Sequence, residues 1–339
     1  MKNFNLFINK FMLIILLISM VLMLNTENFL LKWLLLEMST ITTIVFINFN
    51  NSNKYTSILY YIISSTVSMM IIMILISKNS QIFNLNNFDM NINILFQIMM
   101  LCKLGMFPFN HWMVVMYNKL NWEDIFIMST FMKFIPLYFM INLLYLNMLI
   151  IIMLMISSLM IAMMAKYYNS IKKIIACSTI NQISFMLMLM YFNKLMFMYY
   201  MFFYLIIFYL LCYLLNMFNL NNKIDMIMYN KNNINNKLIF IMFLIHAMLP
   251  PFSSFIIKWF FVNEIINQIM SSWWFFFILL LSSSIIIMSY LNLMENSMFK
   301  FKFNYNLSKT NMIKNFNISM MKILLISVNL FMFQIFYLI

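Results

Sequence analysis

Long runs of apolar residues follow one another along almost the entire chain, with short polar stretches between them. A helix needs about 20 mostly apolar residues to cross about 30 Å of hydrocarbon. Runs such as Met148 to Ile156 lack the alternation of apolar and polar positions that a membrane β-barrel strand requires. The pattern therefore predicts an all-α polytopic membrane protein. We expect eleven transmembrane helices, at residues 5–24, 28–48, 56–77, 91–117, 124–143, 147–165, 171–191, 195–218, 237–262, 272–293 and 319–338.

The composition agrees with this class. Of the 339 residues, 65% are hydrophobic and 9% are charged, and the mean hydropathy is +0.92. A soluble domain carries about 25% charged residues. No linker divides the chain, so we expect a single transmembrane domain over residues 1–339. The first apolar stretch has no small-residue cleavage site, and we expect it to remain as a membrane span.

The lysines predict the orientation in the membrane. With eleven spans, the side that holds the N-terminus carries thirteen lysines, and the opposite side carries only Lys78 and Lys194. By the positive-inside rule, the N-terminus then faces the compartment of synthesis and the C-terminus the opposite side. The net charge of +13 is explained by such flanking lysines, which favour anionic lipid headgroups as partners over nucleic acid.

Four charged residues lie deep within predicted spans: Glu37, Lys103, Lys133 and Lys258. Ionisable groups at this depth cost about 2.5–3.5 kcal/mol and usually face a bundle interior or a water-filled path. A buried lysine can exchange a proton near neutral pH, which arginine cannot do. The four charges therefore predict proton transfer across the membrane. A structural ion pair is the alternative for Glu37, and a position near the membrane interface is the alternative for Lys258.

Two of these lysines lie beside prolines that should break their helices. Pro108 follows Lys103, and Pro250 and Pro251 precede Lys258. Proline removes a backbone donor and clashes with the preceding turn. A broken helix at membrane depth is tolerated only where it is buried in protein or lines a cavity. The recurrence in two halves of the chain predicts antiporter-like inverted repeats with the proton path at the breaks.

Other polar residues form a second group of candidates. Lys172 and Lys173 open a predicted helix, and because neighbours point about 100° apart, at most one of them faces the bundle. His111 and His246 lie near the two breaks, where each either transfers protons or bonds freed carbonyls. Lys32 lies close to a span boundary, and we expect it to reach the membrane interface.

Cofactor sites are not expected in this chain. One glycine, two histidines and three cysteines cannot form a nucleotide-binding loop, a haem ligand pair or an iron–sulfur cluster. We predict no metal site and no redox centre here.

Five motifs resemble, in the same order, those of the chain 2 family of mitochondrial NADH–ubiquinone oxidoreductase, an antiporter-like subunit of the membrane arm of respiratory complex I. They lie at Trp33 to Met38, Lys103 to Trp112, Lys133 to Leu137, Lys172 to Ile180 and Leu249 to Trp259. The sequence departs from these motifs at Asn110, where the family usually has histidine, and at Ser64, where it usually has glutamine.

The resemblance implies that Glu37, Lys103, Lys133 and Lys258 belong to a proton channel. It implies eleven helices in the mitochondrial inner membrane, with the N-terminus on the matrix side and the C-terminus on the intermembrane-space side. NADH, FMN, iron–sulfur clusters and ubiquinone would bind other subunits, and the partners would be neighbouring antiporter-like and small membrane subunits. A stand-alone cation/proton antiporter is the alternative function, although a sodium site would favour clustered acidic residues.

Overall fold

In the computed structural model, the chain is described at residues 2–50, 58–60, 62–68, 70–71, 86–141, 148–228, 233–249, 252, 255, 258–260, 262–263 and 273–299. These residues are helical apart from short turns and one isolated bridge between Ser170 and Asn222. The named helices are α1 (Lys2–Asn25), α2 (Phe29–Asn50), α4 (Asn86–Leu104), α5 (Asn110–Lys119), α6 (Trp122–Ser129), α7 (Phe131–Met140), α8 (Met148–Tyr167), α9 (Ile171–Phe192), α10 (Lys194–Met217), α11 (Lys223–Met228), α12 (Asn233–His246) and α14 (Trp273–Phe299).

The predicted all-α membrane fold is confirmed for this part of the chain. Five helical segments are long and apolar enough to cross a membrane: Phe29–Phe49, Leu149–Tyr167, Ile171–Phe192, Lys194–Met217 and Trp274–Leu293. The predicted span at 319–338 lies outside the described residues. The count of eleven spans, the inverted repeats and the single domain therefore stay predictions.

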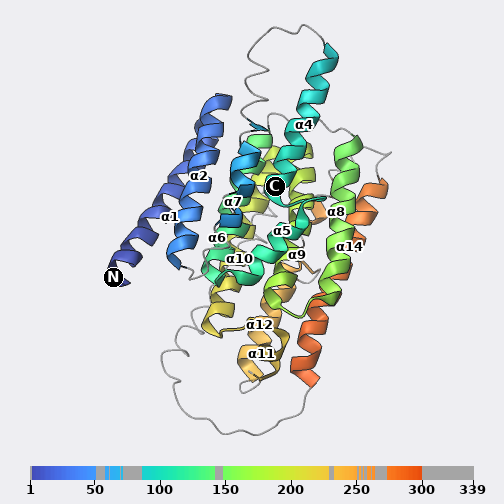
Figure 1. The fold of residues 1–339 in the computed structure, drawn as a ribbon. Helices are drawn as coiled ribbons and strands as arrows, with labels where there is room; N and C mark the ends of the chain where they lie inside the picture. The colour runs from blue at the N-terminus through green and yellow to red at the C-terminus, as the bar shows by residue number, and fades with distance from the viewer. Residues whose placement is uncertain are drawn as a thin grey trace.

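Helix α9 lies at the centre of the bundle and packs against α5, α8, α10 and α14. Figure 1 shows α1 and α2 side by side at one edge, where they contact α7, and α8 beside α14 at the other edge. The hydroxyls of Ser178, Thr179 and Ser184 bond carbonyls of their own helix at 2.5–2.9 Å. Such small, internally satisfied residues let neighbouring helices approach closely, which suits α9 to a position buried on all sides.

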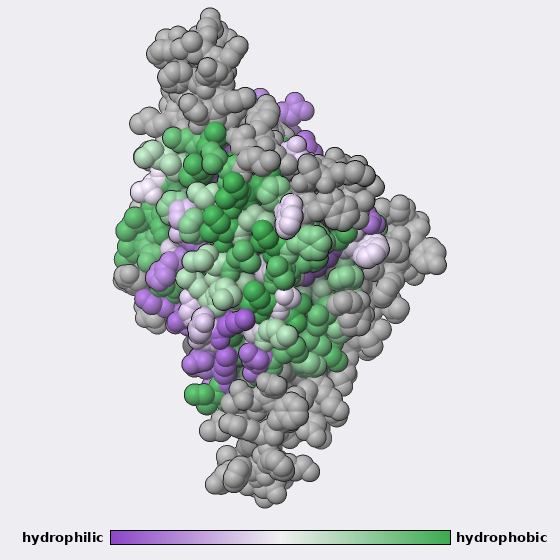
Figure 2. Space-filling model, turned by 90° about the vertical axis from the view of Figure 1, so that its right-hand side faces the viewer, coloured by the Kyte–Doolittle hydropathy of each residue, from purple (hydrophilic) through white to green (hydrophobic). Residues whose placement is uncertain are grey.

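The outer face of α8 and α14 is apolar. Figure 2 looks onto this side of the molecule, which is hydrophobic across its middle. Exposed large side chains there include Leu149, Ile152, Met160, Phe277 and Leu281. Lipid chains and the apolar faces of other membrane helices are equally suitable neighbours for such a surface.

One predicted span proved to be two helices. The span expected over 124–143 is divided into α6 and α7, which meet at Thr130, whose φ and ψ are −112° and −77°. Pro136 inside α7 has no N–H, and its ring crowds the carbonyl of Met132 four residues earlier, so the proline weakens the first turn of α7, next to the break at Thr130. The bend places Lys133 in the first turn of α7.

Candidate functional site

The first part of the candidate site is an ion pair at the end of α4. Lys103 Nζ lies 3.3 Å from Glu37 Oε1 on α2, and the two side chains are 3% and 19% exposed. α4 ends one residue after Lys103 in a Schellman motif, in which Met106 N donates to Leu101 O and Gly105 N donates to the Cys102 carbonyl. The buried Lys103 ammonium, at the end of α4, thus contacts the Glu37 carboxylate of the intact helix α2.

The only glycine of the chain makes this helix end possible. Gly105 has a φ of +71°, which residues with a Cβ rarely adopt. A Cβ at this position would lie 2.7 Å from Met113 Sδ on α5. Across the break, Trp112 Nε1 donates to the Cys102 carbonyl at 3.3 Å. α5 therefore packs directly against the turn, and Trp112 adds a second hydrogen bond to the Cys102 carbonyl, which also accepts from Gly105 N.

Lys133 is the second buried cation. Its side chain is 2% exposed, and Nζ has no hydrogen-bond partner within the described part of the chain. The Nζ atom lies 5.9 Å from the centre of the Tyr117 ring, which is itself fully buried. An aromatic face compensates a desolvated ammonium only in part, because an unpaired buried charge is costly. Lys133 is thus a buried ammonium whose lost hydration the Tyr117 ring replaces only in part.

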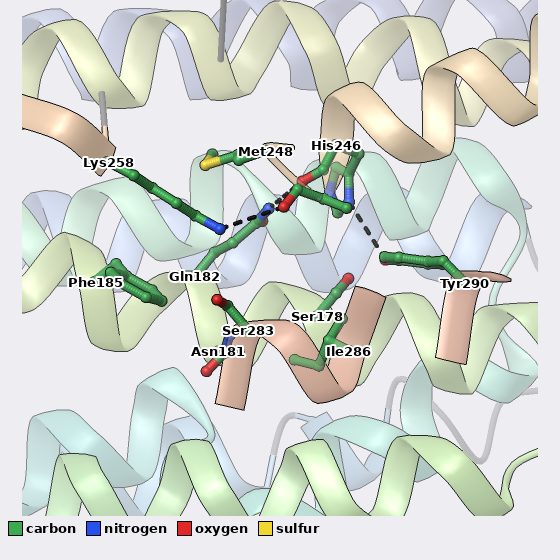
Figure 3. Close-up of a pocket in the computed structure, with 11 residues that line it drawn as sticks. Ser178, Asn181, Gln182, Phe185, His246, Met248, Lys258, Ser283, Ile286 and Tyr290 are labelled. Atoms are coloured by element: carbon green, nitrogen blue, oxygen red, sulfur yellow. Dashed lines mark hydrogen bonds between the residues drawn. The ribbon is translucent and has the colours of Figure 1, made fainter. Parts of the chain in front are cut away.

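The third part of the site lies where α12 ends, in a turn of the same type as the end of α4. Met248 has a φ of +56°, Leu249 N donates to Leu244 O, and Met248 N donates to Ile245 O. The carbonyls freed here are bonded by polar side chains. Lys258 Nζ donates to Ala247 O at 3.3 Å, and Gln182 Nε2 on α9 donates to the His246 carbonyl at 2.9 Å (Figure 3).

Lys258 and His246 border a small cavity between α9, α12 and α14. Lys258 is 8% exposed and lies 5.5 Å from the centre of the Phe185 ring, so its side chain is buried in the protein. The His246 ring contacts Tyr290 and Tyr204, and the Tyr290 hydroxyl lies 3.3 Å from His246 Nδ1. The charges of Lys133 and Lys258 both act on this imidazole. The cavity thus brings Lys258 and the imidazole together, and the charge of Lys133 also acts on that ring.

The paired lysines at the start of α9 point to different neighbours. Lys172 Nζ donates to Leu120 O at 2.7 Å and lies 5.5 Å from the Trp122 ring, whereas Lys173 lies 5.3 Å from the Tyr168 ring. The fully buried Asp124 acts electrostatically on Lys172. Lys172 is therefore the member of the pair that faces the bundle.

The remaining candidates are less deeply placed or lie elsewhere. His111 is exposed at the start of α5, and its neighbour Trp112 bonds the carbonyl at the break. Lys32 in the first turn of α2 is 2% exposed and lies 5.8 Å from the Tyr138 ring, and its expected position at the membrane interface stays a prediction. Asn110 and Ser64 are buried. Pro250 and Pro251 lie outside the described residues, and Pro108 lies in the turn between α4 and α5.

Sequence reasoning missed four polar residues of these sites. They are Asp124, Asn181, Gln182 and Tyr290, all buried. Asp124 could have been found from the sequence, because a carboxylate in the first turn of an apolar helix suggests an interaction with the helix dipole or an ion pair. Asn181 and Gln182 are adjacent amides in a predicted span, and their contacts depend on packing against α12 and α14.

Comparison with protein families matches residues 26–287 to the NADH:quinone oxidoreductase/Mrp antiporter transmembrane family. NADH-ubiquinone oxidoreductase chain 2 of Apis mellifera ligustica is 32% identical over 253 residues, which cover 75% of this chain and 74% of that protein. The protein of the same name from Anopheles gambiae is 28% identical over 326 residues, which cover 91% of this chain and 94% of that protein. The chain belongs to the NADH-ubiquinone oxidoreductase chain 2 family. The family predicted from the five motifs is thus confirmed.

Solved structures agree with the fold of this chain 2 family member. The chain is similar to one in respiratory complex I from Thermus thermophilus with bound aureothin, with a TM-score of 0.78 at 14% identity. The match covers 96% of this chain and 78% of that chain. At this level of identity the likeness supports the antiporter-like membrane fold.

Proposed function

We propose that this chain is the chain 2 subunit of the membrane arm of respiratory complex I and that it carries protons across the mitochondrial inner membrane. The observation that supports this most strongly is the set of buried cations. Lys103 is paired with Glu37, and the charges of Lys133 and Lys258 both act on His246. Charges of this kind are expensive in a membrane protein and mark ion and proton pathways.

The proposed mechanism couples these groups through their charges. At an effective dielectric constant of about 20, two unit charges 4 Å apart interact by about 4 kcal/mol. Loss of a proton at one of these lysines therefore changes how strongly a neighbouring ionisable group holds its own proton. Glu37 would stabilise the charged form of Lys103, and release of that pairing would pass the change on toward Lys133.

The redox chemistry is assigned to other subunits. In this proposal NADH oxidation and quinone reduction take place elsewhere in the complex, and this chain supplies the transmembrane proton path without a redox centre of its own. Its N-terminus faces the matrix and its C-terminus faces the intermembrane space, in accord with the thirteen lysines on the first side. Neighbouring antiporter-like and small membrane subunits are the proposed partners.

Native-gel separation of detergent-solubilised mitochondrial membranes tests the assignment directly. The gel is stained for NADH oxidation, and mass spectrometry locates peptides of this chain. We expect the chain to migrate with the large NADH-oxidising band. Migration alone, or with an assembly that does not oxidise NADH, would overturn the proposal and favour the stand-alone antiporter.

A further inference from the structure

The cavity beside Lys258 is small, is lined by both polar and apolar side chains, and does not include Lys103 or Glu37. It offers about 20 Å³ of space for water centres, and its walls include Ser178, Gln182, His246, Lys258 and Tyr290 (Figure 3). A cavity needs roughly 10–15 Å³ on this measure, and two to four polar partners, to hold one water molecule. Its size and its lining both meet these requirements.

Two buried polar atoms on the cavity walls have no hydrogen-bond partner among the described residues. They are Gln182 Oε1 and His246 Nε2. Gln182 is 7% exposed and His246 is 1% exposed. Lys258 Nζ carries three donors, and the bond to Ala247 O uses one of them. Because buried polar groups in proteins are nearly always bonded to protein or to ordered water, these three groups together indicate a bound water.

Tyr290 fixes the proton arrangement on the imidazole. Its hydroxyl lies 3.3 Å from His246 Nδ1 and also interacts with Ser178, whose own hydroxyl donates to Ile175 O. When the phenol donates to Ser178, it accepts a hydrogen bond from Nδ1–H. The neutral imidazole then carries its proton on Nδ1, and Nε2 is left with a free lone pair.

We propose that this cavity binds one water molecule held by Gln182, Lys258 and His246, and that His246, oriented by Tyr290, exchanges a proton with Lys258 through it. In the forward step the Lys258 ammonium gives a proton to the water, and the water gives one of its own protons to His246 Nε2. Lys258 becomes neutral, the imidazole becomes imidazolium, and the water is regenerated. The inference rests on the proposed function and names Tyr290 as a positioning residue within it.

The charges around the imidazole explain why the transfer must be coupled. Lys258 and Lys133 both act on His246, and the other titratable groups that face it are the phenols of Tyr204 on α10 and Tyr290 on α14. An imidazolium beside two ammonium groups is disfavoured by Coulomb repulsion. When Lys258 gives up the proton that His246 receives, the total charge of the cavity does not change. The step is therefore feasible only as an exchange with Lys258.

The water can be sought directly in the assembled complex. Electron cryo-microscopy at a resolution that shows ordered water should give one density peak within hydrogen-bond distance of Gln182 Oε1 and Lys258 Nζ. A dry cavity at that resolution would overturn the proposal.

The role of Tyr290 is tested with Tyr290→Phe in the assembled complex. This change keeps the ring, which packs 5.2 Å from the Phe243 ring, and removes the hydroxyl. We expect proton-coupled NADH oxidation to fall roughly fivefold, since a neutral hydrogen bond is lost. The solvent deuterium isotope effect on turnover should also rise, because proton transfer at His246 becomes rate-limiting. A purely structural role would leave the isotope effect unchanged.

Tyr200→Phe is the matched control. Tyr200 is equally buried on α10, and its hydroxyl bonds Met248 Sδ at 3.5 Å and not a nitrogen of the imidazole. Equal rates and isotope effects in the two variants would overturn the assignment of Tyr290. Lys258→Met separates this inference from the proposed function. If that variant still pumps normally, both fail; if it does not pump and Tyr290→Phe behaves as Tyr200→Phe does, only the inference fails.

Discussion

Lys103 Nζ lies 3.3 Å from Glu37 Oε1, and this contact joins the last turn of a broken helix to the middle of an intact one. The two partners are not equally buried, since Lys103 is 3% exposed and Glu37 is 19% exposed. The carboxylate is therefore the member of the pair that a group outside this chain can approach, while the ammonium depends on it for charge compensation. A pair with this asymmetry can transmit a change from the surface of the subunit to its interior.

Breaking this pair should impair proton pumping. We expect Lys103→Met and Glu37→Gln each to lower proton-coupled NADH oxidation at least about tenfold, because each removes one ionisable member of the path. On stability, a double-mutant cycle should give a coupling on the order of 1 kcal/mol, since Glu37 is partly open to screening. Proton uptake by vesicles that contain the assembled complex measures the first effect, and thermal disassembly measures the second.

Lys166→Met is the control for these two variants, because Lys166 is an exposed lysine in the last turn of α8. It should leave both the pumping rate and the thermal midpoint unchanged. Normal pumping by Lys103→Met at parental complex levels would remove Lys103 from the path.

Gly105→Ala should disturb the end of α4 without touching a charge. The substitution places a Cβ at a φ of +71° and 2.7 Å from Met113 Sδ. The left-handed conformation alone costs about 1–2 kcal/mol in a residue with a Cβ. We expect less assembled complex and a lower midpoint of thermal disassembly. Adding Met113→Ala should recover only the part of the loss that comes from the clash, and full recovery would contradict a strained φ.

The helices were predictable because their apolar runs are long, and the deep charges were predictable because they interrupt those runs. The break between α6 and α7 was not, since Pro136 lies inside an otherwise strong helical pattern and Thr130 is compatible with a helix. The contacts of Lys103 and Lys258 could not be predicted from the sequence either. Residues 37 and 103 come together only through packing of α2 against the rest of the bundle, and Gln182 meets the His246 carbonyl across two helices.

Asp124 should contribute more to stability than its exposed neighbour. Asp124 is fully buried in the first turn of α6, where its negative charge interacts favourably with the positive end of the helix dipole. It also interacts electrostatically with Lys172. Asp124→Asn should lower the free energy of unfolding by about 1–3 kcal/mol, because a buried charge interaction is lost. The matched control is Glu123→Gln, an exposed carboxylate in the same helical turn. Equal thermal midpoints for the two variants would show that Asp124 has no such role.

Lys133 should separate stability from function. Its Nζ is buried without a hydrogen-bond partner among the described residues, so the ammonium is held there at a cost in solvation that the Tyr117 ring offsets only in part. Methionine has a similar shape and no charge to desolvate. Lys133→Met should therefore leave assembly intact or raise the thermal midpoint of the complex by a few degrees, while proton pumping is lost.

Lys133→Arg distinguishes a titrating group from a fixed charge at the same place. Arginine keeps a positive charge and does not release a proton in proteins. If Lys133 must alternate between charged and neutral forms, the arginine variant should pump as poorly as the methionine variant despite retaining its charge. If a permanent cation is all that the path needs, the arginine variant should pump normally wherever the complex assembles. The charge of Lys133 acts on His246, so the permanent positive charge of an arginine at position 133 should also keep the imidazole neutral throughout turnover.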